Sequence, residues 1–177
     1  WSRGLGDVYK RQSMLRRLKP IGTPDFLLGA DELGRDMLSR LIYGARLSLL
    51  MGLSPVPIAF VIGSLLGITA GYVGGLTNSL IMRTIDVFYA FPSVLLAVAL
   101  SGALGAGLTN ALISITLVFI PPITRVAESV TTQVRGLDYI DAARASGASS
   151  YNIIRVHILG NVLGPIFVYA TGLVSVS

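Results

Sequence analysis

From residue 47 to residue 82 the chain carries no charged side chain. The first part of this run, residues 47–70, is long enough to cross the ~30 Å hydrocarbon core of a bilayer, which takes about 20 residues as a helix. Pro55 and Pro57 would interrupt such a helix in water, but neighbouring helices can satisfy the freed carbonyls within a bundle. This run therefore predicts a transmembrane helix.

The composition of the whole chain also indicates a membrane protein. Hydrophobic residues make up 53% of the 177 residues and charged residues 13%, with a mean hydropathy of +0.72. A soluble domain has about 25% charged residues. The net charge of +5 is therefore expected in loops that face lipid headgroups. With no cysteine and a single histidine, His157, the sequence offers no disulfide or thiolate metal site, and no cofactor is expected in this chain.

Two further apolar regions follow the first one. Residues 87–124 carry no charge but are too long for one span, and the glycine-rich stretch 101–110 divides them into two short crossings. Residues 158–177 form another apolar run. The sequence thus predicts an all-α, polytopic membrane helical bundle with about four transmembrane helices.

Three prolines, Pro92, Pro121 and Pro122, lie near the expected inner ends of the two short crossings. They could act as hinges in a conformational change, because proline weakens the helical hydrogen-bond ladder. They could equally mark the ends of helices. The sequence leaves both interpretations open.

Short-range spacing predicts three local contacts. Gly63 and Gly67 form a small-xxx-small pair, which lets another helix approach closely. Arg83 and Asp86 are three residues apart on an amphipathic piece. They could line a pathway, since ionisable groups near membranes are often functional, but an ion pair near the inner membrane surface is the expectation. Asp31 is expected to cap an amphipathic helix that leads into the membrane.

The first twelve residues, WSRGLGDVYKRQ, share no periodicity with the rest of the chain. They resemble the conceptual translation of an adaptor used in preparing sequencing libraries, so we expect them to be an artefact and exclude them from functional reasoning. Because the chain also stops inside an apolar run, we expect it to be a fragment of a longer protein.

Residues 138–157, DYIDAARASGASSYNIIRVH, form a polar stretch between two apolar regions. Asp138 can cap a first helix, and Ser149 or Ser150 can cap a second one. Gly147 stands where the end of a helix favours a left-handed residue. The stretch therefore predicts two helices at a fixed angle, joined by a glycine turn.

The sequence allows three other interpretations. A glycine turn between two helices is also typical of a DNA-binding helix-turn-helix, but Arg144 and Arg155 are the only cations of the stretch, and no nucleic-acid partner is expected. A plain solvated loop is the second interpretation. A membrane-embedded enzyme is the third, and against it the sequence shows no nucleophile with a base, no carboxylate pair and no phosphate-binding loop.

The polar stretch resembles the Glu-Ala-Ala loop of ABC importer permeases, which reads Glu-Ala-Ala, three free positions, Gly, and further on Ile-x-Leu-Pro. His157 and Gly160 stand where the pattern has Ile and Pro. Residues 28–52 and 71–97 resemble the C-type subunit of the dipeptide, oligopeptide and nickel branch of this family. The positions that match the loop pattern, with Asp in place of Glu, are Asp141, Ala142, Ala143, Gly147 and Leu159.

The resemblance implies the type I importer fold, with residues 47–177 as a transmembrane permease domain and parts of the full protein missing at both ends. Residues 125–157 would be a cytoplasmic coupling loop that docks into a separate ATPase subunit, and residues 13–46 would lie outside. The Lys and Arg residues are almost evenly divided between the two sides, so the positive-inside rule does not fix this orientation.

The same resemblance implies the partners, the location and the cargo. The expected partners are a second permease subunit, two cytoplasmic ATPase subunits that bind ATP and Mg²⁺, an extracytoplasmic substrate-binding protein and membrane lipid. The expected location is the cytoplasmic (inner) membrane of a bacterium or archaeon. The expected cargo is a dipeptide or oligopeptide, or a related cargo such as nickel, and no enzymatic activity is expected in this chain.

Overall fold

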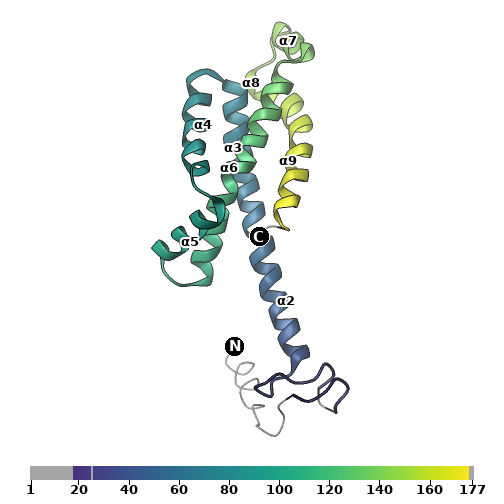
Figure 1. The fold of residues 1–177 in the computed structure, drawn as a ribbon. Coiled ribbons are helices and arrows are strands. Elements are labelled where there is room, and N and C mark those ends of the chain that lie inside the picture. The colour runs from purple at the N-terminus through teal and green to yellow at the C-terminus, as the bar shows by residue number, and fades with distance from the viewer. Residues whose placement is uncertain (1–17, 25, 176–177) are drawn as a thin grey trace. The chain divides into compact units, whose positions relative to one another are not determined.

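The computed structural model describes residues 18–24 and 26–175 and divides into two compact units, Trp1–Leu50 and Met51–Ser177. In the described residues the regular structure is helical, with two isolated β-bridges, so the prediction of an all-α fold is confirmed (Figure 1). The expectation that residues 1–12 are an adaptor artefact lies outside the described residues.

Asp36, and not the predicted Asp31, caps the amphipathic helix. Helix α2 (Met37–Leu53) begins directly after Asp36. The Asp36 carboxylate accepts hydrogen bonds from the backbone N–H groups of Leu38 (3.3 Å) and Ser39 (3.1 Å) and from the Ser39 hydroxyl (2.5 Å). The prediction was wrong because both aspartates precede the same apolar pattern, and spacing does not show which carboxylate reaches the free N–H groups.

Asp31 instead stabilises the turn that precedes α2. Its carboxylate accepts the backbone N–H groups of Leu33 and Arg35 at 2.9 Å, Arg35 Nε at 2.8 Å and Arg40 Nη1 at 2.6 Å. Burial raises the pKa of the Asp31 carboxyl, but the hydrogen bonds and the charge of Arg35 outweigh it and lower the pKa to about 2. The carboxylate therefore stays ionised and holds this turn at neutral pH.

Three helical stretches of the described residues are long and apolar enough to cross a membrane. The first, Met37–Val73, consists of α2 and α3 (Pro55–Val73), with Pro55 in the first turn of α3, where its missing N–H costs nothing. The second is α6 (Leu108–Arg135). The third, Ser150–Leu173, ends with α9 (Leu159–Leu173).

A broken element lies between the first and second of these stretches. Helices α4 (Gly75–Tyr89) and α5 (Ser93–Leu104) meet at a bend of 88° and count as a fourth span if taken together. Of the two short crossings predicted for residues 87–124, the first is bent and not continuous, because α5 alone has 12 residues and about 20 are needed to span the hydrocarbon core. Pro92 directly precedes α5, where its fixed φ and missing N–H favour the break.

Helix α6 runs without interruption through Pro121 and Pro122 to Arg135. The interpretation of these two prolines as helix ends is therefore wrong, and their role as hinges stays a prediction. The first part of the expected coupling loop, residues 125–135, is the last part of this helix. The charge-free run 87–124 thus ends inside α6, eleven residues before the helix does. Helix length follows the backbone hydrogen bonds and not the polarity of the side chains.

Helices α3 and α6 share the most extensive helix–helix contact of the second unit. A Cβ added at Gly67 would lie 2.4 Å from the carbonyl oxygen of Thr124, and one added at Gly63 would lie 2.8 Å from a methyl of Ile123. Gly71, one turn further, is as close to α6. The predicted small-residue contact is confirmed, and we call this interface, with its three glycines, the seam.

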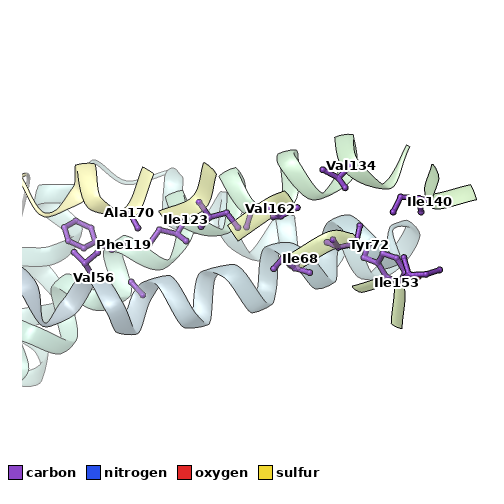
Figure 2. Close-up of a cluster of buried hydrophobic side chains, with 14 of the residues drawn as sticks. Val56, Ile68, Tyr72, Phe119, Ile123, Val134, Ile140, Ile153, Val162 and Ala170 are labelled. Atoms are coloured by element: carbon purple, nitrogen blue, oxygen red, sulfur yellow. The ribbon is translucent and has the colours of Figure 1, made fainter. Parts of the chain in front are cut away.

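Helix α9 packs beside the seam, and buried side chains of α3, α6 and α9 form one continuous cluster (Figure 2). Ile123, Val162 and Ile166 of this cluster are fully buried. One end of the cluster includes Tyr72 of α3 with Ile140 and Ile153, which come from the polar stretch after α6. The hydrophobic core therefore continues into the polar stretch.

Asp86 of α4 pairs with Arg125 of α6, and not with Arg83 as predicted. The three-residue spacing made the Arg83 pair possible, but the packing of α4 against α6 brings in a partner 39 residues further along the chain. Sequence spacing cannot show such a partner.

Candidate functional site

The polar stretch after α6 folds into a short helix, a turn and the start of the last long helix. Helix α7 (Asp138–Ala145) begins directly after Leu137, and Asp138 is its first residue, so the predicted capping role of Asp138 is wrong. Asp138 and Asp141 both lie in the first turn, where negative charge interacts favourably with the helix dipole.

Gly147 ends α7 in the left-handed conformation that the sequence predicts, with φ of +82°. The N–H of Gly147 donates to the carbonyl of Arg144 (2.9 Å), and the N–H of Ala148 donates to the carbonyl of Ala143 (3.1 Å). These two bonds form a Schellman motif. A Cβ at position 147 would meet no atom within 4 Å, so backbone conformation, not space, makes glycine the favoured residue.

The second helix begins at Ser150, and Ser149 is its cap, one of the two serines predicted for this role. The Ser149 hydroxyl accepts the N–H of Asn152 at 3.3 Å. After α8 (Ser150–Asn152) the chain forms a π-helix, η2 (Ile153–Ile158), which leads into α9. Ile153 and Ile158, five residues apart, are both fully buried. We call residues 138–158, from α7 through η2, the α7 unit.

Two fully buried isoleucines, Ile140 and Ile153, attach the α7 unit to the core cluster. The Asn161 side-chain amide of α9 donates to the carbonyl of His157 (2.7 Å) and to the hydroxyl of Tyr139 (3.3 Å). The rings of Tyr139 and His157 lie 5.9 Å apart. These contacts connect α7, η2 and α9 in one place.

The C-terminal end of α3 is held by two arginines. Arg135, the last residue of α6, donates to the carbonyl of Gly71 at 3.3 Å, where a cation complements the negative end of the helix dipole. Arg144 of α7 lies 5.8 Å from the centre of the Tyr72 ring of α3, a cation–π contact. Through Arg144, α7 contacts α3 as well as α9.

The predicted site residues fall into two groups. Asp141, Ala142 and Gly147 are exposed and Ala143 is half-buried, so these four share the outer part of the α7 unit. Asp141 forms an exposed ion pair with Arg144 at 3.3 Å. Leu159, the fifth residue, is the first residue of α9 and packs against the core cluster, on the far side of η2.

Several contacts around the site had no signal in the sequence. Asn78 of α4 donates to Glu128 of α6 at 2.6 Å, and the Thr132 hydroxyl reaches the same carboxylate oxygen at 3.2 Å. Glu128 thereby ties α4 to the seam. Polar residues in apolar helices could have been singled out, because buried or half-buried polar groups need partners, but the identity of those partners depends on the packing.

The arrangement joins an exposed helix to a buried core. Among the residues that the structure describes, no group of three His, Cys, Asp or Glu side chains is placed to hold a metal ion. The α7 unit instead combines an exposed outer helix with buried anchors on three long helices. The α7 unit is therefore attached to the core that α3, α6 and α9 share.

A family model described as "Binding-protein-dependent transport system inner membrane component" matches residues 63–175. This range includes α6, the α7 unit and the whole of α9.

Three relatives illustrate the similarity. The di/tripeptide transport system permease protein DppC of Pseudomonas aeruginosa is 47% identical over 85% of this chain and 50% of its own length. The probable D,D-dipeptide transport system permease protein DdpC of Escherichia coli is 44% identical over 81% and 48%. The glutathione transport system permease protein GsiD of Pectobacterium atrosepticum is 39% identical over 80% and 47%. The chain spans about half the length of the curated relatives it matches.

Proposed function

The chain belongs to the family of binding-protein-dependent transport system inner membrane components, and from this premise we propose that it is part of a permease subunit of an ATP-driven peptide importer. The names of its relatives, which specify di/tripeptides, D,D-dipeptides and glutathione, support a peptide cargo. We leave nickel out of the proposal because these names give no support for it. The DNA-binding regulator and the membrane-embedded enzyme have no support from the family either.

The observation that carries the proposal is the exposed α7 helix, fixed by Gly147 and anchored on the long helices. We propose that α7 is the coupling helix, that it lies on the cytoplasmic side, and that it docks into a separate ATPase subunit. Asp141, Ala142 and Ala143 would form the docking surface. Gly147 would set the angle of this surface, and Leu159 would hold the start of α9 in the core.

The contacts of the α7 unit suggest how a movement would reach the membrane helices. Arg144 and Tyr72 link α7 to α3, while Asn161 links Tyr139 of α7 to α9. Because helices are stiff and the seam is tightly packed, a displacement of α7 would move α3, α6 and α9 as a group. Pro92, Pro121 and Pro122 are proposed as the hinges at which the remaining elements adjust.

The proposal implies an assembly in the bacterial inner membrane. It would contain a second permease subunit, two ATPase subunits that bind ATP and Mg²⁺, and a substrate-binding protein outside the membrane. ATP hydrolysis would take place in the partner subunits, so no catalytic residue is assigned to this chain.

A crosslinking and uptake experiment on the full-length permease tests this proposal. The full-length protein is reconstituted with its partner subunits in proteoliposomes, and ATP-driven uptake of radiolabelled alanyl-phenylalanine is measured. Since residues 1–177 contain no cysteine, Ala142→Cys introduces a defined attachment point on α7 for a short thiol-to-amine crosslinker. The matched control is Ala106→Cys, an exposed alanine in the loop between α5 and α6.

We expect uptake that requires ATP, and a crosslink from position 142 but not from position 106 to an ATPase subunit. Absence of dipeptide uptake would contradict the peptide importer. Uptake with no crosslink from position 142 would contradict the docking of α7.

A further inference from the structure

A cavity of about 310 Å³ lies where the α4–α5 bend faces α6 and α9. Aromatic side chains dominate its wall, and both prolines of α6 contribute to it. We call it the aromatic cavity. Its principal lining residues are Phe88, Tyr89, Phe91, Phe119, Pro122 and Tyr169.

The backbone beside the aromatic cavity is not helical. Between the end of α4 at Tyr89 and the start of α5 at Ser93 the chain turns through 88° (Figure 1). Within the hydrocarbon region, non-helical backbone is tolerated only where protein covers it or where it lines a water-filled space. In membrane transporters, spans interrupted by Pro or Gly are typical of substrate sites. The bend therefore faces the interior of an assembly and not the lipid.

An ion pair stands at the edge of the cavity. Asp86 pairs with Arg125, and the Arg125 guanidinium lies 4.7 Å from the centre of the Tyr89 ring, which lines the cavity. About half of each charged side chain is exposed, 57% for Asp86 and 49% for Arg125. Ionisable groups in membrane segments almost always face the bundle interior or a water-filled cavity. The Asp86–Arg125 pair is therefore expected to face the interior, as the α4–α5 bend does.

We propose that the aromatic cavity and the Asp86–Arg125 pair form a binding subsite for a short peptide with free charged ends, a proposal that rests on the proposed function. The peptide carboxylate binds the Arg125 guanidinium, the peptide ammonium binds the Asp86 carboxylate, and one side chain enters the aromatic cavity.

The chemistry of the pair fits both ends of such a peptide. A guanidinium has five N–H donors in a planar fork that matches a carboxylate, and an aspartate accepts from an ammonium. Because an exposed ion pair contributes little to stability, a peptide can separate the two side chains at small cost. The cavity volume stands at the lower end of ligand pockets, about 300–1,000 Å³, and has room for one large peptide side chain.

Photo-crosslinking in the full-length, reconstituted importer tests the subsite. Tyr169 is replaced by p-benzoylphenylalanine, and the complex is irradiated during ATP-driven turnover with radiolabelled alanyl-phenylalanine. The matched control carries the same replacement at Phe167, two residues away on α9, which lines a different, apolar cavity with Phe60 and Val56. A competitor without charged ends, N-acetyl-alanyl-phenylalaninamide, tests the role of the charges.

The charged residues are tested in the same assay. Asp86→Asn and Arg125→Gln are each expected to lower labelling at position 169 about tenfold, as expected for the loss of one charge-assisted hydrogen bond. Arg83→Gln is the matched control, because Arg83 lies on the same helix and forms no salt bridge in the part of the chain that the structure describes. ATP hydrolysis by each variant complex verifies that the subunit is folded and assembled.

We expect strong labelling at position 169, weak labelling at position 167, and no competition by the blocked dipeptide. Equal labelling at both positions, or labelling that is unchanged in Asp86→Asn and Arg125→Gln, would overturn the subsite while dipeptide uptake still supports the proposed function. If the unmodified importer takes up no dipeptide, the proposed function fails and the subsite fails with it.

Discussion

The seam and the α7 unit both depend on glycine, but for different physical reasons. In the seam, Gly67 lies against the backbone of α6, and a side chain there would overlap the Thr124 carbonyl oxygen. In the α7 unit, Gly147 has free space around it and is favoured by its left-handed φ alone. Gly67 allows α3 and α6 to pack closely, and Gly147 sets the direction in which the chain leaves α7.

The difference predicts different consequences of mutation. Damage to the seam removes the packing on which the bundle depends, because interiors are close-packed and cannot absorb extra volume. A substitution in the α7 unit is expected to leave the bundle folded but to change the position of the exposed helix α7, and with it the proposed docking to the ATPase subunit. The two regions can therefore be separated by comparing folding with transport.

The largest effect is expected from Gly67→Leu. Overpacking usually costs about 1–3 kcal/mol, and we expect more than about 3 kcal/mol here because the clash is with backbone atoms that cannot rotate away. Denaturant unfolding of the full-length protein measures this loss. Gly160→Ala in α9 is the control, since a Cβ there meets nothing within 4 Å, and it should stabilise the helix by about 0.5–1 kcal/mol. A Gly67→Leu protein as stable as the wild type would refute the close packing of the seam.

The next largest effect is expected from Ile140→Ala, which removes the buried anchor of α7. Truncation of a buried isoleucine costs about 2–5 kcal/mol, and we expect about 2 kcal/mol because a short helix can settle into the space. Hydrogen exchange should show loss of protection in α7 and η2 with the seam unchanged. Loss of protection in α3 and α6 as well would mean that the two regions form one cooperative unit.

A smaller effect is expected from Asn161→Ala. This change removes the amide that donates to the His157 carbonyl and the Tyr139 hydroxyl, and a hydrogen bond of this kind contributes about 1 kcal/mol. Hydrogen exchange of the η2 amides measures the effect. Tyr139→Phe removes only the longer of the two bonds and should cost less. An equal cost for both variants would show that the bond to His157 contributes nothing.

The smallest effect is expected from Arg144→Gln. Its ion pair with Asp141 is exposed, and such a pair contributes about 0.2–0.5 kcal/mol and weakens with added salt. Unfolding at low and high salt compares this variant with Arg155→Gln, whose side chain forms no salt bridge within the described residues. A loss above about 1 kcal/mol would show that the contact with Tyr72 anchors α7 more strongly than exposure suggests.

The elements that rest on local rules were predictable from the sequence. The long apolar runs predict the spans, the Gly63–Gly67 spacing predicts the seam, and Gly147 predicts the turn after α7. Each of these features follows from the conformational preference of a residue or from the period of a helix, so the neighbouring residues suffice to infer them.

The features that depend on packing were not predictable in the same way. Asp86 could pair with Arg83 by spacing, and only the approach of α6 selects Arg125. Pro121 and Pro122 are helix breakers by local preference, yet α6 continues through them because its buried face packs against α3. The π-helix η2 has no sequence signature that separates it from an α-helix. In each case tertiary contacts decide between local alternatives of similar energy.

The most direct test of the central claim is the number of dipeptides imported per ATP hydrolysed by Gly147→Leu and Gly147→Asn in the reconstituted, full-length importer. Asn tolerates the left-handed conformation, whereas Leu there costs about 1–2 kcal/mol, which corresponds to roughly a tenfold shift in the population of the turn. If α7 is the coupling helix, Gly147→Leu inserts and supports ATP hydrolysis but imports about tenfold fewer peptides per ATP, while Gly147→Asn stays close to the wild type. A wild-type ratio in Gly147→Leu would contradict the coupling role of the α7 unit.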